Sequence, residues 1–223
     1  MPIEATLQPT RESALVDQNG RVLGPRALNT RRRLLDSTSQ LLRSSGFREL
    51  SVVDVAKSAG TSPATFYQYF RDINDAIYEL AREAMASHEP TIEIIDQTWV
   101  GEAGLVTARK IIEAFVDLWE RYGHVLRARD QLAAEGHERF VALRFDALRP
   151  ILFHLSDQIT GAQESRDVPA EIHPITAAAA MTAILERLVG AYPYLEQLGA
   201  TRDHLVETCS LILYRTVTGR NAS

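Results

Sequence analysis

A run of small and polar residues follows Gly60 and opens a short segment with helical spacing. Thr61, Ser62 and Thr65 carry hydroxyl groups, and Ala64 among them adds no bulk. Small side chains let the first turn of a helix lie deep in the major groove of DNA, with backbone N–H groups and the helix dipole toward phosphate. The same residue types could therefore read base edges.

Two short helices must position these side chains. Ser51 is a good N-cap for the first helix, and Ser62 caps the second with Pro63 at its first helical position, where the missing N–H costs nothing. Ala56 supplies the small residue that a close crossing needs, and Gly60 tolerates the positive φ of a tight turn. The spacing predicts a helix-turn-helix.

Two further side chains of the second helix, Tyr67 and Gln68, can reach phosphates or base edges. An ordinary helical hairpin in an α-bundle would have the same spacing. Charge favours the nucleic-acid interpretation, since residues 21–71 carry nine basic and three acidic side chains and include the run Arg31–Arg33. From residue 72 onward, 14 basic side chains face 23 acidic ones, a balance that would repel DNA.

The remaining chain has helical periodicity throughout, without sustained alternation of β-branched residues. The sequence predicts an all-α fold with a flexible arm over 1–25, a three-helix DNA-binding domain over 26–72 and a ligand-binding and dimerisation domain over 73–223. Gly46 should end the first helix, and Asp72 should cap a fourth helix that breaks or kinks at Pro90. Later helices are expected near residues 103–122, 125–134, 137–161 (kinked or split by Pro150), 174–191 and 201–218.

Residues 46–70, GFRELSVVDVAKSAGTSPATFYQYF, resemble the DNA-binding domain of the tetracycline-repressor (TetR) family of bacterial regulators. The matching features are Gly46-Phe47, Ser51-Val52, the turn ending in Ala59-Gly60, and the stretch from Ser62 to Phe70. The likeness covers about 50 residues with the flanking helices, and its motifs are dense.

The resemblance implies a homodimer that reads a palindromic operator through its third helix. Expected DNA contacts are Thr61, Ser62, Ala64 and Thr65 at bases, Tyr67 and Gln68 at phosphates, and Ser51 near the backbone. The basic run of residues 31–33 adds Arg31 to the expected DNA contacts. A small molecule in the second domain would shift the spacing between the DNA-binding domains of the two subunits. Release of DNA by the ligand is the usual response in the family, so the expected role is that of a repressor.

One position departs from the family pattern. Members usually have a lysine directly after the cap of the fourth helix, where it contacts phosphate, and this chain has Ile73 there. We expect Arg71, or the arginines of the arm, to supply that contact instead.

Aromatic residues form a second group, over residues 99–153. Ligand pockets are mostly apolar with a few polar groups, so we expect a partly apolar effector to contact Phe115, Trp119, Tyr122, Phe145, Met181, Thr182, Leu185 and Glu186. A plain core stripe would have the same spacing. Arg187 is equally compatible with a pocket or with a structural ion pair.

Small residues dominate the segment from Ile175 to Leu188, which would allow helices to approach closely. Together with the last helix it is the expected dimer face, through helices near 174–191 and 201–218; a helix buried within one subunit is the alternative. Cys209 is expected to be a small core residue, because a redox sensor should be exposed.

Several function classes find no support in the sequence. The six histidines form no metal-binding pair on one helix face, and there is no P-loop or nucleophile motif. We therefore expect no catalysis, metal or cofactor, and neither a secretory signal nor a membrane span. A cytoplasmic regulator is the prediction, and a DNA-binding or protein-binding regulator without an effector is the alternative.

Overall fold

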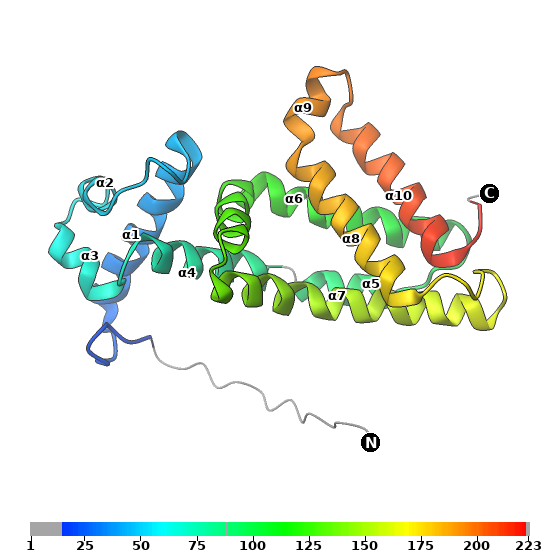
Figure 1. The fold of residues 1–223 in the computed structure, drawn as a ribbon, viewed down its shortest axis with the longest axis horizontal. Helices are drawn as coiled ribbons and strands as arrows, with labels where there is room; N and C mark the ends of the chain where they lie inside the picture. Colours follow the sequence, from blue (N-terminus) through cyan, green and yellow to red (C-terminus); the bar gives the residue numbers. More distant parts are fainter. Residues whose placement is uncertain (1–14, 88, 222–223) are drawn as a thin grey trace. The chain divides into compact units, whose positions relative to one another are not determined.

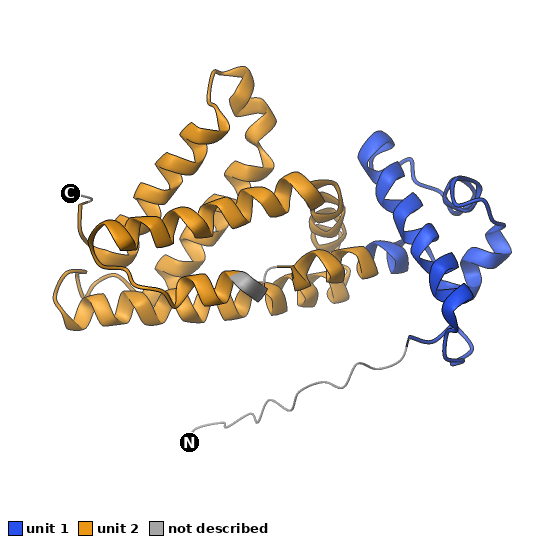
Figure 2. Cartoon of the chain, turned by 180° about the vertical axis from the view of Figure 1, so that it is seen from behind, with its two compact units in different colours: residues 1–77 blue, residues 78–223 orange. Residues whose placement is uncertain are grey.

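In the computed structural model, which describes residues 15–87 and 89–221, the chain forms two compact units. Figure 1 shows the helices of the chain in sequence order. Unit 1, blue in Figure 2, ends at Ile77, and unit 2, in orange, begins at Tyr78. The predicted domain boundary after residue 72 lies five residues earlier. Of the expected arm over 1–25, residues 1–14 lie outside the described residues. The all-α prediction is confirmed, and among the described residues the only strand-like pairing is an isolated bridge between Val16 and Val22.

Unit 1 is built on α1 (Pro25–Ser45), α2 (Val52–Ser58), α3 (Pro63–Tyr69) and the start of α4 (Ile73–Ala86). Leu34, Leu35 and Leu42 form the buried stripe of α1, at the helical spacing that the sequence predicts. Gly46 ends α1 with a φ of 80°. As predicted, Asp72 caps α4, with its carboxylate accepting a hydrogen bond from the Asp75 N–H at 2.8 Å.

Unit 2 contains the rest of α4 and the remaining helices. These are α5 (Glu89–Ile95), α6 (Gly101–Ala134), α7 (Glu138–Glu164), α8 (Pro174–Gly190), α9 (Tyr192–Gln197) and α10 (Arg202–Thr218). α6 packs against α5, α7, α8 and α10, and α7 packs against α8. Their shared core includes Phe115 of α6, Ile151 of α7, Met181 and Leu185 of α8, and Leu213 of α10.

One predicted helix break is wrong, and of the kink or split predicted at Pro150 the split is wrong. α6 runs unbroken through Gly123, where separate helices over 103–122 and 125–134 were expected, and α7 continues through Pro150 without splitting. A glycine costs about 1 kcal/mol inside a helix and a proline about 3 kcal/mol. Burial of Leu118 and Leu126 on either side of Gly123, and of Ile151 beside the proline, outweighs these costs.

Two smaller features also differ from expectation. The fourth helix ends at Ala86, and Pro90 falls within the separate short helix α5. The short helix α9 was not predicted, because its six residues from Tyr192 to Gln197 are too few to establish a periodic pattern.

The turn at Gly60 provides a test of the local fold. Gly60 has a φ of +61°, and an added Cβ would lie 2.9 Å from Nη2 of Arg33. We expect Gly60→Ala to lower the free energy of unfolding by about 1–2 kcal/mol, because the left-handed conformation is strained for other residues. The measurement is chemical denaturation of the purified variant.

The matched control is Gly24→Ala in the same unit. Gly24 has a φ of −76° and no atom within 4 Å of an added Cβ, so its change should cost less than the change at Gly60, about 0.5 kcal/mol for the weaker N-cap of α1. Equal effects of the two substitutions would contradict this account of the turn.

Candidate nucleic-acid interface and ligand cavity

The turn between α2 and α3 is held by backbone groups and by one arginine. The Thr61 N–H donates to the Ala56 carbonyl at 2.9 Å. The Arg33 guanidinium, from α1, donates to the carbonyl of Ala59 and, at 3.4 Å, to that of Gly60. α1 thereby fixes the direction in which α3 leaves the turn.

The first turn of α3 is stabilised by its own cap. Ser62 Oγ accepts a hydrogen bond from the Thr65 N–H at 3.2 Å and lies 3.0 Å from Thr65 Oγ1. Phe66 and Phe70 form the buried side of this segment, with ring centroids 5.4 Å apart. All six side chains of the segment that are predicted to contact DNA are exposed or half-buried: Thr61, Ser62, Ala64, Thr65, Tyr67 and Gln68.

The arginine run of α1 is largely committed to contacts within unit 1. The Arg31 guanidinium lies 5.2 Å from the centre of the Phe70 ring, and Arg32 pairs with Asp36 at 2.8 Å. With Arg33 at the turn, each residue of the run has an internal partner. The positive surface available to DNA is therefore smaller than the count of basic residues suggests. Ser51, also predicted to contact DNA, caps α2 by accepting from the Asp54 N–H at 3.2 Å.

Arg71 lies between α3 and α4 with its side chain 69% exposed. Its Nε and Nη2 donate to the two carboxylate oxygens of Asp75 at 2.9 and 3.0 Å. This bidentate hydrogen bonding raises the pKa of Arg71 above its ordinary value. The pair holds the Arg71 guanidinium at the surface in a fixed orientation.

A short turn before α1 packs against the end of α3, a feature that sequence reasoning missed. The Gln18 backbone N–H donates to the Gln68 carbonyl at 3.0 Å, and its side-chain amide donates to the Tyr69 carbonyl at 3.1 Å. These bonds satisfy carbonyls at the last turn of α3. The Asn19-Gly20 pair, a common hairpin-turn signal, could have indicated this turn.

In unit 2, a cavity of about 260 Å³ lies between α7 and α8. Of the predicted ligand contacts it brings together Phe145, Thr182 and Glu186. The others lie elsewhere: Phe115, Met181 and Leu185 in the core, Trp119 against the core, and Tyr122 against a smaller apolar cluster around Leu118 and Leu126.

A buried charged cluster adjoins this cavity, and sequence reasoning missed its central residue. The Arg129 side chain is only 1% exposed and lies 2.7 Å from Asp130 and 3.5 Å from Glu186. Glu186 also accepts a hydrogen bond from Arg144 at 2.6 Å. A third contact of Arg129, to the sulfur of Met85 at 3.1 Å, reaches α4. The cluster thus connects α4, α6, α7 and α8.

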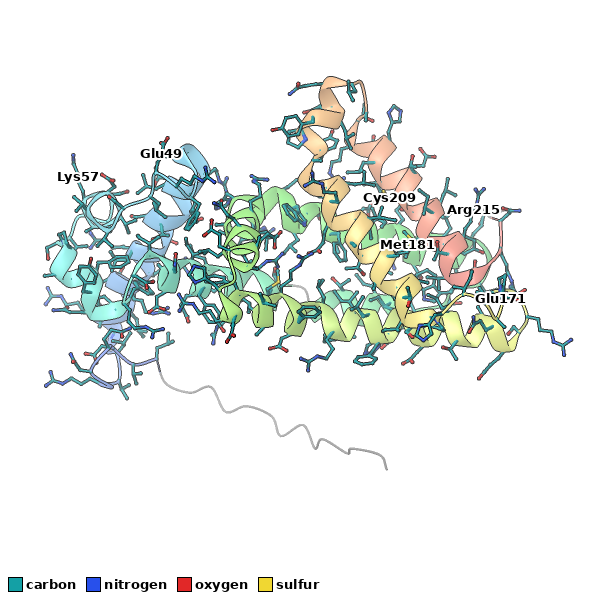
Figure 3. All side chains as sticks on the ribbon, in the orientation of Figure 1. Glu49, Lys57, Glu171, Met181, Cys209 and Arg215 are labelled. Carbon is teal, nitrogen blue, oxygen red and sulfur yellow. The ribbon has the colours of Figure 1, made fainter. Side chains whose placement is uncertain are left out.

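Other parts of the described chain offer weaker candidates. An open hollow of about 610 Å³ in unit 1 is lined by charges of both signs, including Glu49 and Lys57 (Figure 3). Across residues 15–87 and 89–221, no group of three or more His, Cys, Asp or Glu side chains is arranged to hold a metal ion. None of the described helices is long and apolar enough to cross a membrane.

The predicted dimer face would use the exposed sides of α8 and α10. Ile184 on α8 and Ile212 on α10 are 45% and 42% exposed. Met181 and Cys209, labelled in Figure 3, belong to the buried sides of the same two helices. Burial raises the pKa of the Cys209 thiol, which disfavours the reactive thiolate.

Both units match known protein families. A family model described as bacterial regulatory proteins, tetR family, matches residues 34–75, and one described as tetracyclin repressor-like, C-terminal domain, matches residues 92–223. No curated protein sequence matches the chain.

Two solved structures illustrate the likeness in fold. FadR from Bacillus subtilis, solved in complex with stearoyl-CoA, is 20% identical with a TM-score of 0.61, over 85% of this chain and 99% of its own. The MbdR regulator from Azoarcus sp. CIB is 16% identical with a TM-score of 0.64, over 86% of this chain and 98% of its own.

The buried cluster leads to a prediction on stability. Glu186→Ala would leave the buried Arg129 guanidinium with Asp130 as its remaining carboxylate partner. We expect a loss of about 3 kcal/mol in the free energy of unfolding, because removing one partner of a buried ion pair leaves charge poorly compensated. Chemical denaturation would measure it.

Asp36→Ala serves as the control, since it removes a partner of Arg32 in an ion pair whose two side chains are both exposed. That change should cost less than about 1 kcal/mol. If both substitutions cost less than about 1 kcal/mol, the buried cluster does not contribute to stability as described.

Proposed function

Because the chain belongs to the tetracycline repressor-like (TetR) family of transcriptional regulators, we propose that it is a repressor that binds a palindromic operator as a homodimer. A partly apolar small molecule bound in unit 2 would release it from DNA. The observation that carries the proposal is the short helix α3, capped by Ser62, with its small and polar side chains on the outside. That arrangement suits a recognition helix in a major groove.

The contacts divide into two kinds under this proposal. Thr61, Ser62, Ala64 and Thr65 would face bases and provide sequence preference, while Tyr67 and Gln68 would contact phosphates and hold the position of the helix. Arg71 would provide the phosphate contact that the family usually obtains from a lysine at the position of Ile73. Its third guanidinium nitrogen, Nη1, has no partner in the described part of the chain, so a phosphate can bind there without breaking the pair with Asp75.

Dimerisation is proposed through α8 and α10. Their exposed sides carry Ile184 and Ile212, and α8 has no charged residue from Pro174 to Leu185. The two recognition helices of the dimer must lie about 34–36 Å apart to enter successive major grooves. A ligand can change this spacing only by binding one arrangement better than the other.

The α7–α8 cavity is the proposed site of the effector, with apolar walls and a polar end at Thr182 and Glu186. FadR from Bacillus subtilis, of the same fold, was solved with stearoyl-CoA bound. That precedent supports an effector with an apolar part. A DNA-binding or protein-binding regulator without an effector remains the second candidate, because Ile73 replaces a usual phosphate contact.

Selection from random duplex DNA tests the proposed function. The purified full-length chain should enrich a palindrome whose half-sites are centred about 10 base pairs apart or a multiple of that spacing. The protein should be unfolded, washed and refolded before selection, so that no co-purified ligand interferes. If the refolded protein enriches no sequence, it is not a specific DNA-binding repressor.

The role of Arg71 can be tested on the selected duplex. Arg71→Ala should weaken binding to all sequences alike and reduce the slope of log affinity against log salt by about 1, because one phosphate contact is lost. Fluorescence anisotropy over a salt series measures both quantities.

Arg149→Ala is the control, since this arginine of α7 is also exposed and also pairs with an aspartate, Asp146, but lies in unit 2. It should leave affinity and slope unchanged. An unchanged slope for Arg71→Ala would show that Arg71 does not supply this phosphate contact.

A further inference from the structure

The α7–α8 cavity has apolar walls for most of its extent. Phe145, Leu148 and Leu152 line it from α7, and Ala179 and Ala183 line it from α8. Phe145 is 65% exposed at the surface of the protein. The volume, about 260 Å³, is slightly below the usual range of pockets for drug-sized ligands. The cavity therefore suits the apolar part of a small molecule.

The polar end of the cavity presents donors to a ligand more readily than acceptors. Glu186 is 11% exposed, and its two oxygens face Arg129 at 3.5 Å and Arg144 at 2.6 Å. Arg144 is 41% exposed, and only its Nη2 donates to Glu186. A molecule entering from solvent meets guanidinium N–H groups, whereas the carboxylate oxygens already have partners.

The arrangement of the existing ion pairs also favours an anion over a cation. An anionic group that pairs with Arg144 leaves Glu186 beside Arg129, and Arg129 beside Asp130 at 2.7 Å, so no charge loses its last partner. A cation would have to displace arginines from the Glu186 oxygens. An arginine guanidinium also fits a carboxylate through two parallel hydrogen bonds.

We propose that the α7–α8 cavity binds a small amphipathic carboxylate, with its chain against Phe145, Leu148 and Leu152 and its head group on Arg144. This inference rests on the proposed regulatory function and names the chemical class of the effector. When the carboxylate is bound, Arg144 would pair with it instead of with Glu186, and Glu186 would keep Arg129 as its partner. Because Arg129 also contacts Met85, this change of partner alters the charges around Arg129, beside the last turn of α4.

Three probes with the same chain length test the head-group preference. Decanoate, decanol and decyltrimethylammonium would be titrated into the full-length protein below their micelle-forming concentrations, by calorimetry and by thermal shift. Decanoate should bind about tenfold tighter than the other two or better, because hydrogen bonds to a charged group are strong. It should also raise the melting temperature, as a ligand of the folded state does.

Variants assign the binding to the cavity. Arg144→Gln should reduce decanoate affinity to that of decanol, and Leu148→Trp should abolish binding of decanoate by filling the cavity. Arg149→Gln is the matched control, because this arginine is exposed on the same helix but does not line the cavity. It should bind decanoate like the unmodified protein. The melting temperatures of the ligand-free variants show whether each one is folded.

The proposal is overturned if the unmodified protein binds decanoate no tighter than decanol, if it prefers the cation, or if folded Arg144→Gln keeps the preference for decanoate. DNA selection with the same preparations distinguishes failure of this inference from failure of the proposed function. An enriched palindrome without decanoate preference would remove only the effector class. Decanoate preference without any enriched DNA would remove the repressor and leave the binding site. With both present, decanoate should release the operator from the unmodified protein and not from Arg144→Gln.

Discussion

The DNA-binding unit depends on hydrogen bonds from the Arg33 guanidinium to the carbonyls of Ala59 and Gly60. The end of α2 leaves carbonyls without helical partners, and Ala59 is buried, so an unsatisfied carbonyl there would cost about 1–3 kcal/mol. By satisfying them, α1 fixes the turn and hence the exit of α3. The positive φ of Gly60 makes the chain reversal possible, and Arg33 makes it stable.

Unit 2 uses an arginine in a comparable way. Arg129 is buried among α4, α6 and α8, and its charge is tolerated because carboxylates of Asp130 and Glu186 lie beside it. Replacing such a cluster by apolar residues is often neutral or stabilising, so stability alone does not explain it. Its contact with Met85 of α4 and its link to the α7–α8 cavity make it suited to transmit ligand binding, which is consistent with the proposed regulation.

Sequence reasoning predicted the elements that depend on local chemistry. The caps at Ser51, Ser62 and Asp72 and the turn at Gly60 were recognisable because they need particular residue types at fixed spacing. Features decided by tertiary packing were not: α6 continues through Gly123 because buried residues lie on both sides of it, and the burial of Arg129 depends on residues of α4 and α8 that are distant in the sequence. Of the predicted ligand contacts, only Phe145, Thr182 and Glu186 line the proposed cavity, since core and pocket side chains have the same helical spacing.

Under the proposed function, the first turn of α3 reads bases. The most direct measurement compares the unmodified protein with Thr65→Val on a set of operator duplexes, each altered at one base pair, at constant salt. Our account predicts that the variant loses discrimination at one base pair of each half-site while its preferences elsewhere persist, because only a base contact carries sequence information. Uniform weakening across all duplexes, or no change at any, would contradict it.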